Sequence, residues 1–231
     1  MHLDTGTLMA ISDMLGTVAF SISGAVCAIE RGLDLFGVLF LGVVTAIGGG
    51  VIRDTMLGVC PPVSFSDYVY LLLAVAAAGV VWTLTWLCTR GERPAHFRDD
   101  PVLNVCDAIG LGVFSVIGVQ AGIAAGYEEN FYFCLFLGLT TGVGGGMLRD
   151  VLSCEIPFVL RKHFYAMASL IGALCYYCTH LTYPNGSVVI STLLVVALRV
   201  AAFHYRWGLP RLPVEEPERA EEPPISSVQE E

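Results

Sequence analysis

The chain has 231 residues, of which 55% are apolar and only 14% are charged, and its formal net charge is -9. Because soluble domains carry about 25% charged residues, this composition excludes a typical water-soluble domain and indicates lipid as the main solvent. The sequence contains no basic patch with interleaved aromatic residues, no nucleotide-binding loop, no Ser-His-Asp arrangement and no zinc pattern. We therefore expect neither a nucleic-acid partner nor an enzyme.

Seven apolar segments are each close to the ~20 residues that a helix needs to cross the hydrocarbon core of a bilayer. Backbone polar groups must be satisfied internally in lipid, and the segments lack a two-residue alternation, so we expect helices and not a β-barrel. The predicted helices span residues 10–29, 36–58, 67–88, 103–125, 131–153, 163–181 and 187–205. A charged loop is expected at 89–102, and the Pro- and Glu-rich tail at 210–231 is expected to be disordered.

The basic residues indicate the orientation of this seven-helix plan. The N-terminal segment 1–9 and the loops near 59–66, 126–130 and 182–186 contain no Arg or Lys. The segments on the opposite face contain nine, namely Arg31, Arg90, Arg93, Arg98, Arg161, Lys162, Arg206, Arg211 and Arg219. Since cytoplasmic loops are enriched in Arg and Lys, this count predicts an external N-terminus and a cytoplasmic C-terminus.

Two stretches of the sequence are nearly identical. Residues 48–54 read Gly-Gly-Gly-Val-Ile-Arg-Asp, and residues 144–150 read Gly-Gly-Gly-Met-Leu-Arg-Asp. Further matches at the same offset of 96 are Gly42 with Gly138, Thr45 with Thr141 and Pro61 with Pro157, and matches at an offset of 94 are Asp13 with Asp107, Phe20 with Phe114, Ser21 with Ser115 and Gly24 with Gly118. These ordered matches indicate an internal repeat with units at 10–88 and 103–181, followed by a seventh helix at 187–205. Each unit has three spans, an odd number, so the second unit is predicted to be inverted in the membrane.

A glycine triplet lies near the middle of the second and of the fifth predicted helix. The triplets are Gly48, Gly49 and Gly50, and Gly144, Gly145 and Gly146. Each glycine costs about 1 kcal/mol relative to alanine in a helix interior, so three in a row favour a bend or an unwound segment that lines a pore. The alternative is close helix packing, for which small residues are typical in membranes.

Six charged residues lie inside predicted spans, and they are Asp13, Arg53, Asp54, Asp107, Arg149 and Asp150. A charge at the centre of a membrane helix costs about 2.5–3.5 kcal/mol on insertion scales. At ~1.5 Å rise per residue, Asp13 and Arg53 lie at similar depth near the outer face, and the inversion places Asp107 and Arg149 together near the inner face. Each unit is therefore predicted to form its own Asp–Arg pair, either as a structural ion pair or as part of a permeation path.

Hydroxyl residues near the triplets are candidate pore-lining groups, and they are Ser21, Thr45, Ser115 and Thr141. Their oxygens suit the hydration of a cation. The alternative is that they donate to the backbone of their own helices, as serine and threonine often do. We expect no metal site and no cofactor, apart from a permeant K⁺ or Na⁺ ion.

Two Gly-Gly-Gly-x-x-Arg-Asp motifs in a plan of three, three and one helices resemble the prokaryotic members of the trimeric intracellular cation (TRIC) channel family, over about residues 8–205. The resemblance implies a homotrimer in the bacterial inner membrane. It also implies a pore in each protomer for monovalent cations, chiefly potassium, that passes the two glycine triplets. The broader bacterial family has members associated with glycine uptake, so a carrier of a small amino acid stays open as the alternative. The lipid regulation of animal members is not carried over, because the helix at 103–125 contains no Lys or Arg.

Overall fold

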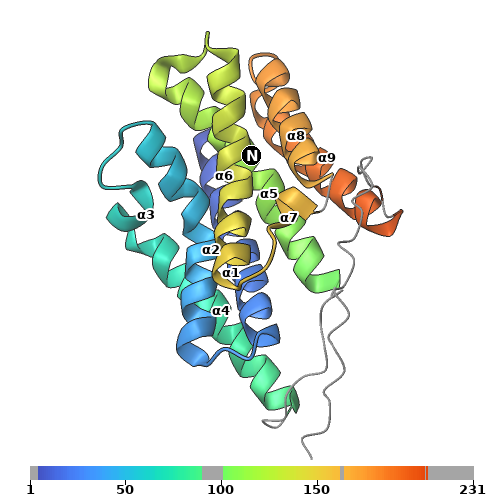
Figure 1. The fold of residues 1–231 in the computed structure, drawn as a ribbon. Coiled ribbons are helices and arrows are strands. Elements are labelled where there is room, and N and C mark those ends of the chain that lie inside the picture. The colour runs from blue at the N-terminus through green and yellow to red at the C-terminus, as the bar shows by residue number, and fades with distance from the viewer. Residues whose placement is uncertain (1–4, 90–100, 162–163, 206, 208–231) are drawn as a thin grey trace, which may run out of the picture.

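The structure, a computed structural model, describes residues 5–89, 101–161, 164–205 and 207. Within these residues the secondary structure is helical. The elements in chain order are α1 (Thr5–Glu30), α2 (Leu35–Met56), α3 (Val63–Ser66), α4 (Tyr68–Thr89), α5 (Pro101–Gly122), η1 (Ile123–Tyr127), α6 (Phe131–Leu152), α7 (Phe158–Arg161), α8 (Tyr165–Thr179) and α9 (Pro184–His204). The long helices pack into one elongated bundle (Figure 1). The loop predicted at 89–102 falls almost entirely outside the described residues, and the tail predicted at 210–231 falls wholly outside them.

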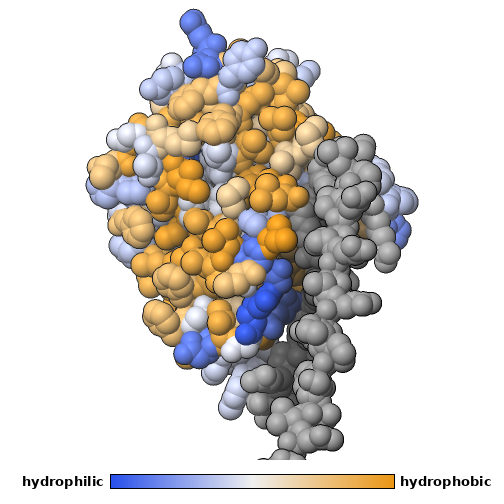
Figure 2. All heavy atoms as spheres, in the orientation of Figure 1, coloured by the Kyte–Doolittle hydropathy of each residue, from blue (hydrophilic) through white to orange (hydrophobic). Residues whose placement is uncertain are grey.

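Six of the described helices are long and apolar enough to cross a membrane, namely α1, α2, α4, α5 with its continuation η1, α6 and α9. They agree with six of the seven predicted spans. The sequence analysis predicts the remaining span over 163–181, where the structure has α8 with 15 residues. At ~1.5 Å per residue this helix is ~22 Å long, shorter than the hydrocarbon core. Apolar side chains cover most of the middle of the face in Figure 2, as expected for a surface that meets lipid.

Two short helices, α3 and α7, lie where the sequence analysis predicts only loops. Each is held by the aspartate that ends a Gly-Gly-Gly-x-x-Arg-Asp motif. The Val63 backbone N–H donates to Asp54 Oδ2 at 2.8 Å, and the Phe158 backbone N–H donates to Asp150 Oδ2 at 2.7 Å. The last residue of the motif therefore fixes how the chain leaves α2 and α6.

The centre of the bundle is formed by α1, α2, α5 and α6. The third helix of the first unit, α4, packs against α1 and α2, the third helix of the second unit, α8, packs against α5 and α6, and α9 packs against α5 and α8. Residues at matching positions of the two units make matching contacts. Phe20 of α1 packs on Gly110 of α5, and Phe114 of α5 packs on Gly16 of α1. The two rings meet with their centroids 5.2 Å apart. An apolar plug thus fills the middle of the interface between α1 and α5.

Both glycine triplets lie within continuous helix, because α2 and α6 run through them without a break. A methyl group on Gly49 would overlap the Thr141 carbonyl oxygen, and a methyl group on Gly145 would overlap the Thr45 carbonyl oxygen. The central glycines therefore let α2 and α6 cross with their backbones in contact. The unwound segment that the triplets predict is not present in these two described helices, and close packing explains the central glycine of each triplet.

Candidate functional site

A buried ion cluster, here called the Asp107 cluster, joins α1, α5, α6, α8 and α9. Its centre is Arg149, whose side chain is 0% exposed. Arg149 Nη1 lies 2.9 Å from Asp107 Oδ1, and its Nε donates to Asp150 Oδ1 at 2.9 Å. The same guanidinium also donates to the Ser23 hydroxyl of α1. Arg149 thus links the carboxylates of α5 and α6 to α1. The Tyr165 hydroxyl of α8 also donates to Asp107 Oδ1, at 3.3 Å.

A second arginine enters the Asp107 cluster from the last helix, α9. Arg199 is 4% exposed, and its Nη2 lies 3.8 Å from Asp107 Oδ2. Its guanidinium carbon lies 4.5 Å from the centre of the Tyr165 ring, in a cation–π arrangement. Arg199 Nε finds no hydrogen-bond partner among the described residues. The cluster therefore contains two guanidinium groups and two carboxylates.

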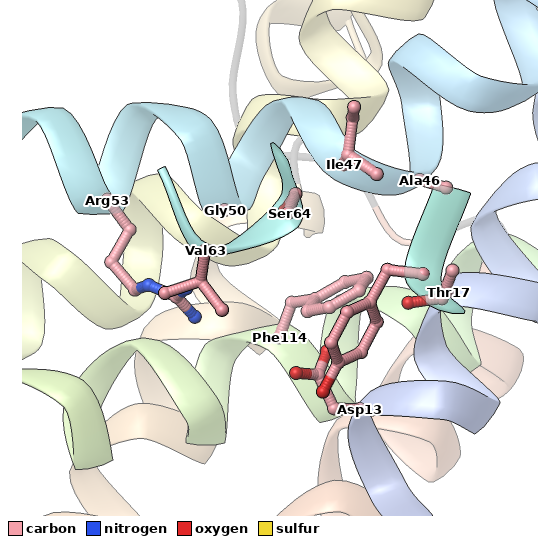
Figure 3. Close-up of a pocket in the computed structure, with 10 residues that line it drawn as sticks. Asp13, Thr17, Ala46, Ile47, Gly50, Arg53, Val63, Ser64 and Phe114 are labelled. Carbon is pink, nitrogen blue, oxygen red and sulfur yellow. The ribbon is translucent and has the colours of Figure 1, made fainter. Parts of the chain in front are cut away.

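The matching residues of the first unit are arranged differently. Arg53 Nε donates to Asp54 Oδ1 at 2.8 Å, and Arg53 Nη2 lies 2.7 Å from the same oxygen. Asp13 of α1 lies across a pocket from Arg53, and Figure 3 shows the two side chains on opposite sides of it. Tyr70 of α4, which matches Tyr165, lines the same pocket as Asp13.

The pocket, here called the Asp13 pocket, is bordered by α1, α2, α3, α4 and α5. The centre of a water molecule can occupy ≈ 20 Å³ of this pocket. That is enough for one water molecule. Phe114, one ring of the apolar plug, forms part of its wall (Figure 3). The lining residues are Asp13, Thr17, Ala46, Ile47, Gly50, Arg53, Val63, Ser64, Tyr70 and Phe114.

Comparison with known proteins places this arrangement in a family. The sequence model of the family described as "Glycine transporter" matches the chain twice, at residues 10–86 and 104–181. A UPF0126 membrane protein of Vibrio cholerae is 38% identical over 211 residues, which cover 90% of this chain and 84% of the relative. The UPF0126 inner membrane protein YadS of Escherichia coli K12 is 37% identical over 207 residues, which cover 88% of this chain and 96% of YadS.

The solved structures that resemble the chain are TRIC cation channels. One, from work on the structural basis of conductance, has a TM-score of 0.76 and 36% identity, and the match covers 90% of this chain and 98% of that one. Another, a prokaryotic TRIC channel crystallised in 0.5 M KCl, has a TM-score of 0.78 and 32% identity, and the match covers 88% of this chain and 100% of that one. The chain belongs to the family of UPF0126 proteins and TRIC channels. It is a multi-pass membrane protein, with six described helices long and apolar enough to span a membrane.

Of the two Asp–Arg pairs predicted for this TRIC-family chain, the structure confirms one. Arg149 binds Asp107 directly. Arg53 binds Asp54 instead, and within the described residues it forms no ion pair with Asp13. The predicted Asp13–Arg53 pair is therefore wrong for this conformation, because the Asp13 pocket separates the two groups.

The four predicted pore hydroxyls are all buried in this TRIC-family fold, with 0% of each residue exposed. Each donates to a backbone carbonyl oxygen, Ser21 to Ala74 at 2.6 Å, Thr45 to Leu41 at 2.6 Å, Ser115 to Leu111 at 2.6 Å and Thr141 to Leu137 at 2.5 Å. None of them lines the Asp13 pocket. Of the six triplet glycines, Gly50 does line it.

Sequence reasoning missed three residues of these sites, namely Tyr70, Tyr165 and Arg199. The tyrosines carried a usable signal, since they match at an offset of 95 in the third helix of each TRIC-family repeat unit. Arg199 also carried one, since an arginine inside a predicted span needs a partner. Ser23 has no hydroxyl counterpart in the second unit, where the matching position is Ile117.

Proposed function

We propose that the protein is a monovalent cation channel, permeable to potassium, with one pore in each protomer of a homotrimer. The solved TRIC cation channels support this, since the match covers 98% and 100% of their chains. The observation that carries the proposal is the series of residues along the inward face of α1. It runs from Asp13 and Thr17 at the pocket, through Phe20 of the plug, to Ser23 in the Asp107 cluster.

This series defines the proposed pore, which follows α1 between α2, α5 and α6. Asp13 and Ser23 are ten residues apart, a rise of ~15 Å along a helix. Polar groups lie at both ends of that distance, and the Phe20–Phe114 contact closes the middle. Apolar constrictions gate channels by excluding water, so separation of the two rings opens the path. The glycine triplets flank the path, with Gly50 at the pocket and Gly145 against Phe20.

The proposed orientation follows from the basic residues and from the inversion of the second unit. The Asp13 pocket then faces the outside of a bacterial inner membrane, and the Asp107 cluster lies near the cytoplasm. A reporter fused after Val214 should read cytoplasmic, and a reporter at the N-terminus should read external. Reporters on the same face would contradict the seven-span plan.

Planar bilayer recording tests the channel directly. Purified protein should give unitary currents in KCl, and under a KCl gradient the reversal potential should lie near the potassium value and far from the chloride value. Phe20→Ala removes half of the plug and should raise the open probability. Phe36→Ala is the matched control, since Phe36 is 74% exposed on α2 and lies outside the proposed path. Absence of unitary currents from correctly folded wild-type protein would refute the channel.

A carrier of a small amino acid such as glycine is the second candidate. Two observations favour it, the description of the matching family and the presence of a carboxylate and a guanidinium on opposite sides of one pocket. A carrier alternates access and produces no unitary currents. Saturable uptake of labelled glycine into proteoliposomes, without unitary currents, would establish this candidate in place of the channel.

A further inference from the structure

Equivalent side chains of the two repeat units have different surroundings at the two ends of the molecule. At the Asp107 cluster, the Arg199 guanidinium lies beside Asp107 and over the ring of Tyr165. The equivalent side chains of the first unit, Asp13 and Tyr70, both line the Asp13 pocket. Among the described helices, α9 packs against α5 and α8 of the second unit, and the first unit has no matching helix. The Arg199 guanidinium therefore lies beside Asp107, whereas the equivalent place beside Asp13 is a pocket.

The charges at the two ends differ accordingly. The Asp107 cluster has the carboxylates of Asp107 and Asp150 and two guanidinium groups, so its formal charges cancel. The first unit has the carboxylates of Asp13 and Asp54 and only one guanidinium, so one negative charge is left over. Arg53 is held by Asp54 through two contacts, which leaves the excess charge on Asp13. Asp13 is half-buried, and a carboxylate without a bound cation is costly in a site of low dielectric.

The oxygens of the Asp13 pocket suit an alkali cation. Thr17 is 2% exposed and lines the pocket. Figure 3 shows the Thr17 hydroxyl on the same side as the Asp13 carboxylate. Ser64 and Tyr70 add further hydroxyl groups. Hard cations prefer such oxygen ligands, and the space for one water molecule also accommodates one dehydrated potassium ion, which is of similar size.

We propose that the Asp13 pocket is a binding site for one monovalent cation, and that Arg199 occupies the equivalent place at Asp107 and so prevents a second site there. This rests on the proposed channel function, for which the pocket would be the cation site at the external end. The channel then has one cation site, although its repeat would generate two. Cations entering from the external side meet an attractive site, whereas cations entering from the cytoplasmic side meet a neutral cluster.

Thermal unfolding of the purified full-length protein tests the site without any current. The midpoint should be higher in KCl than in N-methylglucamine chloride at the same concentration, because the organic cation is too large for the pocket. Asp13→Asn and Thr17→Val should each remove most of that potassium-dependent difference. Glu129→Gln is the control, since Glu129 is an exposed carboxylate in the loop before α6, away from the pocket, and should keep the full difference. Retention of the full difference by both pocket variants would overturn the site.

Arg199→Met tests the second half of the proposal. Removal of the guanidinium leaves the Asp107 cluster with the same charge excess as the Asp13 pocket, so the potassium-dependent difference in midpoint should become larger than in the wild type. An unchanged difference would refute the role of Arg199. The double variant Asp13→Asn/Arg199→Met should then retain a difference that Asp13→Asn alone has lost.

Conductance separates this proposal from the channel itself. In low KCl, Asp13→Asn should lower the current carried from the external side by at least about threefold, and the loss should shrink in high KCl, as expected when a charge concentrates ions locally. A wild-type protein that carries no current refutes the channel, whatever the unfolding data show. A wild-type protein that conducts, together with an Asp13→Asn variant of unchanged current and unchanged potassium dependence, refutes only the site.

Discussion

The two ion clusters are built from the same motif, yet one is closed and the other open. Arg149 is 0% exposed and contacts two carboxylates and a hydroxyl, whereas Arg53 is 11% exposed and contacts a single carboxylate. The difference comes from residues outside the motif. Arg149 donates a hydrogen bond to Ser23 of α1. The position of α5 that matches Ser23 holds the apolar Ile117, so Arg53 has no equivalent hydroxyl partner there. The repeat therefore sets the fold of both units, and single unrepeated residues decide which end is closed.

This contrast has an energetic meaning. A buried arginine with two carboxylates is held by several charge-assisted hydrogen bonds, and each of these is stronger than a neutral one. Loss of the arginine strands both charges. Around Arg53 the pocket admits water, so a stranded carboxylate there can be hydrated. The two ends should therefore respond unequally to the same substitution.

Arg149→Met should give the largest effect. It leaves Asp107 and Asp150 without their main partner and should cost about 3–5 kcal/mol of unfolding free energy. Arg53→Met is the matched variant at the open end and should cost less, about 1–3 kcal/mol, because only Asp54 loses a direct contact. Thermal and denaturant unfolding in detergent measure both. Equal losses would show that the two clusters are equally closed in the membrane protein.

Much of the fold could be predicted from the sequence, because lipid imposes long apolar helices and the matched positions reveal the repeat. The Asp107–Arg149 pair could also be predicted, from depth along the two helices. The open Asp13 pocket could not, since it depends on how α4 packs against α1 and how α3 packs against α2 and α4, and no sequence pattern fixes that packing. The sequence leaves two roles open for the triplets, because glycine weakens a helix and also permits close contact. The tertiary crossing of α2 and α6 shows close contact at the central glycine of each triplet.

Double-mutant cycles should give an intermediate effect. Direct contact at 2.9 Å predicts a coupling energy of about 1–3 kcal/mol between Asp107→Asn and Arg149→Met. Asp13→Asn and Arg53→Met, separated by the pocket, should couple by less than about 0.5 kcal/mol. The cycles are measured by unfolding in the same detergent. A strong coupling of the second pair would mean that Asp13 and Arg53 close onto one another in solution and fill the pocket.

The smallest effects are expected at the third glycine of each triplet, and there the two ends should differ in sign. A methyl group on Gly50 would find its nearest neighbours at ordinary contact distances, 3.5 Å from Ser64 Oγ and 3.8 Å from Arg53 Nη2. Gly50→Ala should therefore gain helix propensity, up to about 1 kcal/mol of stability. A methyl group on Gly146 would lie 2.9 Å from the Tyr165 hydroxyl inside the closed cluster. Gly146→Ala should lose about 1 kcal/mol or more, as overpacked sites do.

The central glycines provide the control for this comparison, and potassium flux gives it a second readout. Gly49→Ala and Gly145→Ala would each press a methyl group onto a carbonyl oxygen of the crossing helix, so both should destabilise and neither end should be favoured. Gly50→Ala is different, because it leaves the helix crossing intact while its methyl group takes space from the Asp13 pocket. Potassium flux into liposomes, normalised to folded protein, should fall in Gly50→Ala although its unfolding midpoint does not. If flux and stability instead change in parallel in all four alanine variants, the triplets act only through packing, and the pocket at Gly50 lies off the permeation path.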